Sequence, residues 1–149
     1  MGGRSRWGIT PRQSVETACA RHGQQAVIAG CVTLLAGDPE ADGDVDPALV
    51  AALGGPRGPD FLDAPPGQRY WLRVWAARGL LWAPWGAGAA TGAVIGALAD
   101  EHWRVREMAA KVVARHRVDE AQPAVAHLLT DDVERVRAAA SRAVRILAG

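Results

Sequence analysis

Residues 98–114, "LADEHWRVREMAAKVVA", and residues 129–145, "LTDDVERVRAAASRAVR", carry one pattern twice, 31 positions apart. The residues that coincide at this offset are Leu98 with Leu129, Asp100 with Asp131, Arg104-Val105-Arg106 with Arg135-Val136-Arg137, Ala109 with Ala140, and Val113 with Val144. Self-similarity at a fixed period of this length is the sequence signature of a repeat protein, in which each copy is one supersecondary unit. The pair therefore predicts a repeat architecture.

An earlier copy lies 33 positions before the first of these segments. Residues 70–73, "YWLR", align with residues 103–106, "WRVR", and residues 76–78, "AAR", align with residues 109–111, "AAK". This alignment makes residues 69–85 the second helix of an earlier repeat.

Each copy has the pattern of a helical hairpin. In the last copy the apolar residues Val136, Ala140, Val144 and Leu147 recur at i, i+4, i+8 and i+11, which places them on one stripe of a helix. A single hairpin cannot bury such a stripe, whereas stacked neighbours form a continuous core. The expected fold is all-α, a right-handed α-solenoid of stacked helical hairpins.

The rest of the chain completes a predicted single domain over residues 1–149. Thr10-Pro11-Arg12-Gln13 has the form of a capping box and begins a helix, and Asp46-Pro47 begins a short one. Residues 38–47 are expected to form an acidic loop, and Asp119 is expected to cap the first helix of the last copy. The predicted segments are two capping helices in 10–36, a first repeat in 46–85 with an extended insertion at 54–67, a second repeat in 89–117 and a third in 119–149.

The composition limits the class of protein. Hydrophobic residues make up 49% of the 149 residues, which excludes a largely disordered chain. With two cysteines there is no disulfide framework, so we expect a reduced, cytoplasmic protein. Residues 79–99 carry no charge and are long enough to cross a bilayer, but Pro84 and a run of small residues interrupt them. We expect the end of one helix, a turn and the start of the next there, and no membrane association.

The pattern of Asp100 with Val105-Arg106, and of Asp131 with Val136-Arg137, resembles the HEAT repeat, of the short bacterial kind also found in phycobilin-lyase-like proteins. The resemblance covers residues 89–149, extends to 46–149, and reaches residues 10–36 by helical character alone. It implies an armadillo-like scaffold that binds a protein partner, since such proteins mostly act as adaptors. A minority resemble DNA glycosylases that act on alkylated bases.

The resemblance also implies that the aspartate and the second arginine of each copy pair with one another. We expect Asp100, Arg106, Asp131 and Arg137 to be structural for this reason, since partly buried charges need partners. Arg73 occupies the matching position without an evident aspartate, and we expect it to be freer.

Candidate binding residues lie on another row of the second helices. Arg78, Lys111 and Arg142 align across the copies, and so do Trp71, Arg104 and Arg135. These side chains are expected to form a basic, tryptophan-containing concave face; the alternatives are a solvated arginine-rich surface, and tryptophans covered by Phe61 and Leu62. The predicted binding residues are Trp71, Trp75, Arg78, Arg104, Lys111, Arg115, Arg135 and Arg142.

No catalytic residue, metal site or cofactor is predicted. Cys19, His22 and Cys31 are zinc-ligand types, but a fourth ligand is missing. Glu107, the acid inside the second helices near the cations, does not reproduce the arrangement of the glycosylases.

The sequence therefore favours a non-enzymatic, monomeric adaptor whose partner is a protein with an acidic surface. The alternative is a nucleic-acid-binding protein related to the alkylated-DNA glycosylases, which the same basic face would serve. A third hypothesis is a structural subunit that docks through its apolar N-terminal helix.

Overall fold

The structure, a computed structural model, describes residues 8–85 and 88–149. All regular structure in these ranges is helical, which confirms the all-α prediction. The chain divides into two compact units, Met1–Trp85 and Gly86–Gly149, and each is described by itself.

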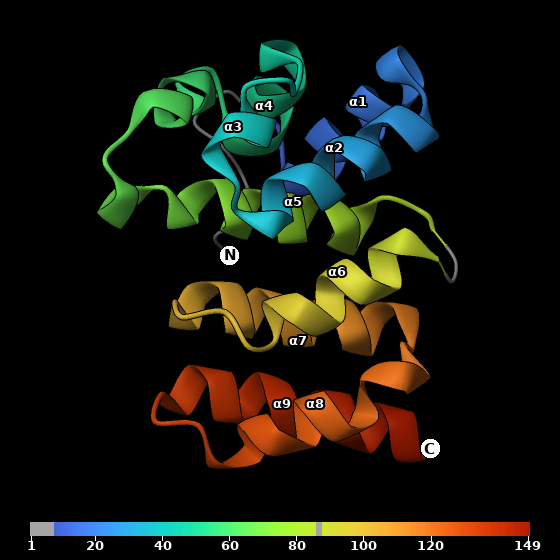
Figure 1. Cartoon of the computed structure of the whole chain (residues 1–149). Helices are drawn as coiled ribbons and strands as arrows, with labels where there is room; N and C mark the ends of the chain where they lie inside the picture. Colours follow the sequence, from blue (N-terminus) through green and yellow to red (C-terminus); the bar gives the residue numbers. More distant parts are fainter. Residues whose placement is uncertain (1–7, 86–87) are drawn as a thin grey trace. The chain divides into compact units, whose positions relative to one another are not determined.

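The first unit is built around helix α5. Its helices α1, α2 and α4 all contact α5 (Figure 1). Apolar residues from α2, such as Val27 and Leu34, and from α5, such as Leu72 and Leu80, are fully buried between them. The elements are α1 (Pro11–His22), α2 (Gln24–Ala36), α3 (Pro39–Asp42), α4 (Pro47–Gly54), the 3₁₀ helices η1 (Gly58–Asp63) and η2 (Pro66–Gln68), and α5 (Tyr70–Trp82).

Local capping residues set where these helices begin. The Thr10 hydroxyl accepts the Gln13 N–H, and the Gln13 side chain accepts the Thr10 N–H, which is the predicted capping box. Asp46 caps α4 by accepting the N–H of Ala48, and a proline follows each cap in the first turn. Both predicted helix starts are confirmed.

The acidic segment after α2 is not simply a loop. Asp38 accepts the N–H of Glu40 and so starts the short helix α3. This helix buries Asp42 to 2% exposure, and its carboxylate accepts a hydrogen bond from Arg69 at 2.5 Å. The expectation of an acidic loop is wrong here, because a short helix forms and a pair with an arginine 27 residues away partly compensates the burial of the charge.

The segment at residues 54–67, expected as an extended insertion, is partly helical. This segment contains the 3₁₀ helix η1 and the start of η2, and η1 packs against α4 and α5. The guanidinium of Arg69 donates to the carbonyl groups of Phe61 and Leu62, which holds the end of η1 against the start of α5. The prolines and glycines of the segment therefore form tight turns.

The uncharged stretch of residues 79–99 does not form one helix. Helix α5 ends at Trp82 with Ala83 in an extended conformation before Pro84, and α6 begins at Ala89. No helix in residues 8–85 or 88–149 combines the length and the apolar character needed to span a membrane.

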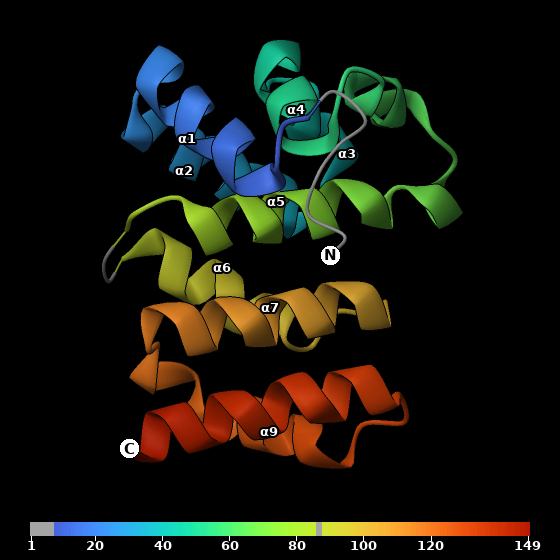
Figure 2. The same cartoon turned by 180° about the vertical axis from the view of Figure 1, so that it is seen from behind.

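The second unit consists of two helical hairpins. Helix α6 (Ala89–Ala97) packs on α7 (Trp103–His116), and α8 (Gln122–His127) packs on α9 (Glu134–Ala148), with the 3₁₀ helices η3 (Asp119–Ala121) and η4 (Leu128–Thr130) beside α8. Figure 2 shows α7 and α9 side by side, running in the same direction. Asp119 begins η3 and does not cap an α-helix as predicted, because a 3₁₀ turn precedes the Gln122-Pro123 start of α8.

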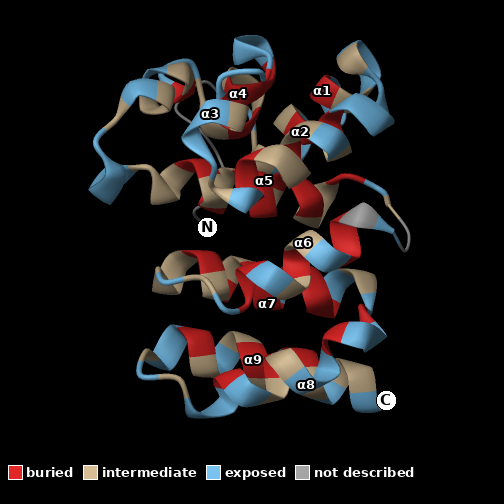
Figure 3. Cartoon of the chain, in the orientation of Figure 1, coloured by how far each residue is buried: buried red, intermediate tan, exposed pale blue. Residues whose placement is uncertain are grey.

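The apolar stripes of α7 and α9 form the core of this unit. Val105, Ala109 and Val113 on α7 have no exposed surface, and neither have Val136 and Ala140 on α9. Figure 3 shows buried residues where helices of the unit face one another and exposed residues on their outer sides. The predicted stripe is confirmed up to Ala140, whereas Val144 and Leu147 near the end of α9 are half-buried.

Candidate functional site

An ion pair joins the two hairpins of the second unit. Arg106 on α7 donates from Nε to Oδ2 of Asp131 at 2.8 Å and from Nη2 to Oδ1 at 3.2 Å. Its Nη1 donates to the carbonyl oxygen of Asp100 at 2.9 Å, and Arg137 repeats that contact with the carbonyl oxygen of Asp131 at 2.7 Å. These contacts show that both arginines have structural roles, as predicted.

The environment of Asp131 favours its charged form. Burial acts to raise the pKa of its carboxyl group, but hydrogen bonds from Arg106 and from the Val133 N–H, with the charges of Arg106 and Arg137, outweigh burial and lower the pKa. The pair is therefore ionised at neutral pH.

Arg73 was expected to lack an aspartate near it, but the structure places it close to one. Its positive charge acts on the carboxylate of Asp42, and its side chain lies against the backbone at Gly37. No sequence pattern predicts this contact, because Asp42 lies in a segment with the composition of a loop.

Glu107 is the centre of a cation cluster on the second unit. It is 8% exposed, and its Oε2 accepts a hydrogen bond from Nε of Arg135 at 3.0 Å and lies 3.7 Å from Nζ of Lys111. The predicted residues Lys111 and Arg135, from two different repeats, are thus held together by one carboxylate. Because both cations share Glu107, this carboxylate is engaged in ion pairing and is not placed as a free catalytic acid.

Trp103 belongs to this cluster and was not among the predicted residues. The guanidinium carbon of Arg104 lies 4.5 Å from the centre of its ring and that of Arg135 lies 5.3 Å from it, so both make cation–π contacts. A signal was present, since Trp103 lies one helical turn before Glu107 and directly before Arg104. We define the α7/α9 cation surface as Trp103, Arg104, Lys111, Arg115, Arg135 and Arg142.

The outer members of this surface are open to solvent. Lys111, Arg115, Arg135 and Arg142 are exposed, and Arg104 is half-buried. Helices α7 and α9 together contain eight basic residues and two acidic ones, Glu107 and Glu134. Positive charge therefore predominates along both helices.

The three predicted residues of the first unit are mainly packed. Trp75 meets the ring of Phe61 edge-on, with centroids 5.0 Å apart, and Trp71 stacks on Trp75 at 6.3 Å. This is the packing by the inserted segment that the sequence offered as an alternative. Arg78 donates from Nη2 to the carbonyl oxygen of Leu53 at 2.8 Å, and burial lowers its pKa.

The two sets of predicted residues belong to different units. Trp71, Trp75 and Arg78 lie on α5, and the five other predicted residues lie on α7 and α9. One continuous concave face built from both sets stays a prediction.

The cysteines of the first unit are poor metal ligands. Burial raises the pKa of the Cys31 thiol to about 12, and burial with the nearby Glu16 carboxylate raises that of Cys19. Within residues 8–85 and 88–149, no three histidine, cysteine or acidic side chains form a cluster that could hold a metal ion.

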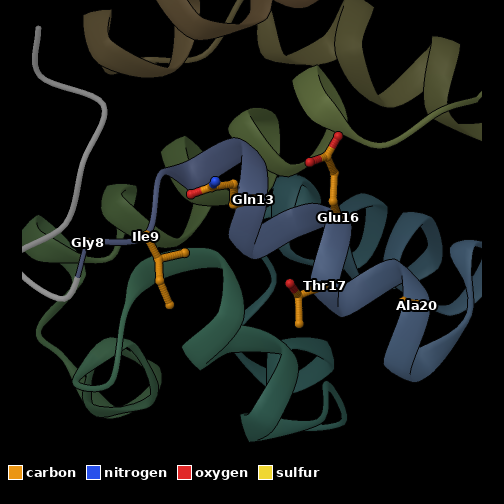
Figure 4. Close-up of a pocket in the computed structure, with 6 residues that line it drawn as sticks. All are labelled: Gly8, Ile9, Gln13, Glu16, Thr17 and Ala20. Carbon is orange, nitrogen blue, oxygen red and sulfur yellow. The ribbon is translucent and has the colours of Figure 1, made fainter.

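A shallow depression runs along α1. Figure 4 shows its lining, in which Gln13 and Glu16 supply the longest polar side chains. Gln13 is engaged in the capping box, and Glu16 pairs with Arg12 at 3.4 Å. These groups have local structural roles, so the depression offers no convergent polar site.

Comparison with known families agrees with the arginine–aspartate contact that recurs in the two hairpins. A family model described as HEAT repeats matches residues 67–145. The chain belongs to the HEAT-repeat family. The match covers α5 and almost all of the second unit, and HEAT repeats generally act as scaffolds for protein interactions. No curated protein and no solved structure matches the chain.

Proposed function

We propose that this HEAT-repeat chain is a non-enzymatic adaptor, and that its α7/α9 cation surface binds an acidic region of a partner protein. The observation that carries the proposal is the sharing of Glu107 by Lys111 and Arg135. One buried carboxylate positions two cations from successive repeats, and it balances only one of their two charges.

The tryptophan adds a second kind of contact. Trp103 presents a ring beside Arg104 and Arg135, and tryptophan and arginine are the residues most enriched among energetically important interface contacts. The exposed Lys111, Arg115 and Arg142 extend the positive charge along both helices. Such a surface attracts an acidic partner over distances of about 10 Å at ordinary salt.

The predicted residues Trp71, Trp75 and Arg78 enter this proposal as a second contact region, on α5. The stacked rings of Trp71 and Trp75 are half-buried, so their accessible edges offer apolar area. Because Arg78 supports the backbone at Leu53, a substitution of Arg78 would disturb folding and is unsuitable as a test of binding.

The test measures fluorescence anisotropy of a labelled polyglutamate peptide and of labelled single- and double-stranded DNA. A triple variant, Lys111→Ala, Arg115→Ala and Arg142→Ala, is compared with the natural chain. The matched control removes three exposed arginines elsewhere: Arg21→Ala, Arg57→Ala and Arg117→Ala. We expect the first variant to bind the peptide at least tenfold more weakly, and the control to bind within about twofold of the natural chain.

Two results would overturn the proposal. Equal losses in both variants would show that only net charge matters. Tighter binding of DNA than of the peptide, with an affinity that falls steeply between about 50 and 200 mM salt, would favour the nucleic-acid alternative, because displaced counterions produce that dependence.

A further inference from the structure

The guanidinium group of Arg137 has the same placement as that of Arg106 but fewer partners. Each Nη1 donates to the carbonyl oxygen of the aspartate six residues earlier, Asp100 for Arg106 and Asp131 for Arg137. In Arg106 the remaining edge, Nε and Nη2, holds the carboxylate of Asp131. In Arg137 this edge makes no hydrogen bond or ion pair with any residue of 8–85 or 88–149.

The residues around Arg137 on α9 are more exposed than the equivalent residues of α7. On α7 the contact of Glu107 with Arg135 shows which face meets α9, and Ala110 and Ala114 lie on that face and are buried. The residues 31 positions later on α9 are Ala138, Ser141 and Arg145, and each is exposed or half-buried. Likewise Leu98 is 2% exposed, whereas its equivalent Leu129 is 41% exposed.

We infer that this end face, defined as Leu129, Arg137, Ala138, Ser141 and Arg145, docks the aspartate-bearing turn of a partner's helical hairpin. Charge complementarity and the internal template identify the occupant. Arg106 shows that a guanidinium in this position takes a carboxylate at two points, and that the carboxylate comes from a turn just before a helix. The planar fork of arginine fits this bidentate contact, and lysine would not reproduce it.

The composition of the end face fits an acidic partner. Ala138 replaces the Glu107 of the preceding repeat, so an approaching helix meets a small side chain and no carboxylate there. Arg145 replaces the buried Ala114 and adds a second cation. The exposed Leu129 supplies apolar area at the level where Leu98 is buried.

The end face shares no residue with the α7/α9 cation surface, so its test must measure a signal from Arg137. The full chain, labelled with ¹⁵N, is titrated with a synthetic peptide of the sequence of residues 129–138, and the Nε–H resonance of Arg137 is followed. The peptide contains the aspartate that Arg106 already recognises. A control peptide carries the Asp131→Asn change.

We expect a saturable shift of the Arg137 resonance that is at least fivefold weaker with the asparagine peptide. Substitution of Arg137 could disturb the turn whose carbonyl oxygen it binds at Asp131, so a second test keeps Arg137 and changes a neighbouring residue. Ser141→Glu puts a carboxylate one helical turn after Arg137, where it competes for the guanidinium, and we expect it to abolish the shift. Ser141→Gln, which adds no charge, should retain the shift.

The inference is overturned if Arg137 does not respond, or if both peptides act equally. It is also overturned if sedimentation shows that the chain dimerises and that Arg137→Lys abolishes the dimer, since the occupant would then be a second copy. Failure of the polyglutamate test leaves this result unaffected, because the triple variant retains Arg137.

Discussion

Arg106 and Asp131 hold successive hairpins together by two parallel hydrogen bonds, 2.8 and 3.2 Å long. The side chain of Arg106 is 18% exposed and that of Asp131 is 8% exposed, so water screens this pair little. The contact bridges 25 residues of sequence and links α7 to the turn before α9. It therefore sets the packing of one repeat on the next.

Replacing Asp131 by asparagine should destabilise the second unit strongly. The neutral amide can still cap the N–H of Val133, so the change removes chiefly the ionic contact. We expect a loss of about 3 kcal/mol in the free energy of unfolding, since it leaves the charge of Arg106 poorly compensated. Urea denaturation followed by circular dichroism measures this loss.

Asp132→Asn is the matched control for this change. Asp132 is exposed in the same turn, and its replacement removes the same charge. We expect the control to change stability by less than about 0.5 kcal/mol. Similar losses in both variants would show that the ion pair contributes nothing specific.

The stability of the first unit should depend on pH through Asp42. Burial raises the pKa of its carboxyl group and outweighs the opposing effect of Arg69. The folded state therefore binds a proton at a pH where the unfolded chain, with an aspartate pKa of about 3.9, does not. Consequently, as pH falls from neutral toward about 4, the natural chain should gain stability relative to Asp42→Asn. A constant difference between the two proteins over this range would contradict the raised pKa.

Asp131 should show the opposite dependence. Its pKa is lowered in the folded state, so the stability that its charge contributes is present above about pH 4 and is lost as pH falls through the lowered value. The difference in stability between the natural chain and Asp131→Asn should thus shrink on acidification. Titration of the side-chain carboxyl carbon shifts of Asp42 and Asp131 measures both pKa values in one experiment. If both pKa values lie above, or both below, that of an unfolded aspartate, one of the two predictions is wrong.

Glu107→Gln should lower the stability of the second unit and also strengthen its binding of anions. The amide cannot balance Lys111 and Arg135, so we expect a loss of about 1–2 kcal/mol in unfolding free energy. The same change removes one negative charge beside the α7/α9 cation surface and so raises its net charge by one, which should raise the salt concentration needed to elute the protein from heparin. Glu134→Gln, at an exposed position of α9, is the control. An equal rise in the control would attribute the effect to net charge alone.

Much of the fold could be predicted from short sequence signals. Capping residues and prolines determine helix starts locally, which is why the box at Thr10 and the cap at Asp46 were predictable. The resemblance to HEAT repeats implied that Arg106 and Asp131 are structural, and the ion pair between them agrees with this. Periodicity succeeded for Val105 and Val136 because one face of each helix is covered by another helix.

The errors have physical causes too. Asp42 lies among prolines, glycines and acids that read as loop, and its burial depends on Arg69, which local pattern does not reveal. A helical position gives the face of a side chain but not the direction of its charged end. Arg78 turns its guanidinium to the carbonyl of Leu53, and Trp103 gains its contacts from Arg135 on another helix.

Gly79→Ala should destabilise the first unit even though alanine favours helices. A Cβ atom at Gly79 would lie 2.6 Å from Sγ of Cys31 and 2.7 Å from Cδ2 of Leu53, so α5 would be forced away from α2 and α4. Such overpacking lowers the free energy of unfolding by about 1–3 kcal/mol. The gain from alanine over glycine in a helix is roughly 1 kcal/mol, so the net effect is destabilising. Gly92→Ala in α6 is the control, because a Cβ there would meet no described atom within 4 Å apart from its chain neighbours and the backbone of its own helix. Thermal unfolding should show a lower melting temperature for the first variant and an unchanged or higher one for the second. A higher melting temperature for Gly79→Ala would mean that the close approach of the three helices is not required.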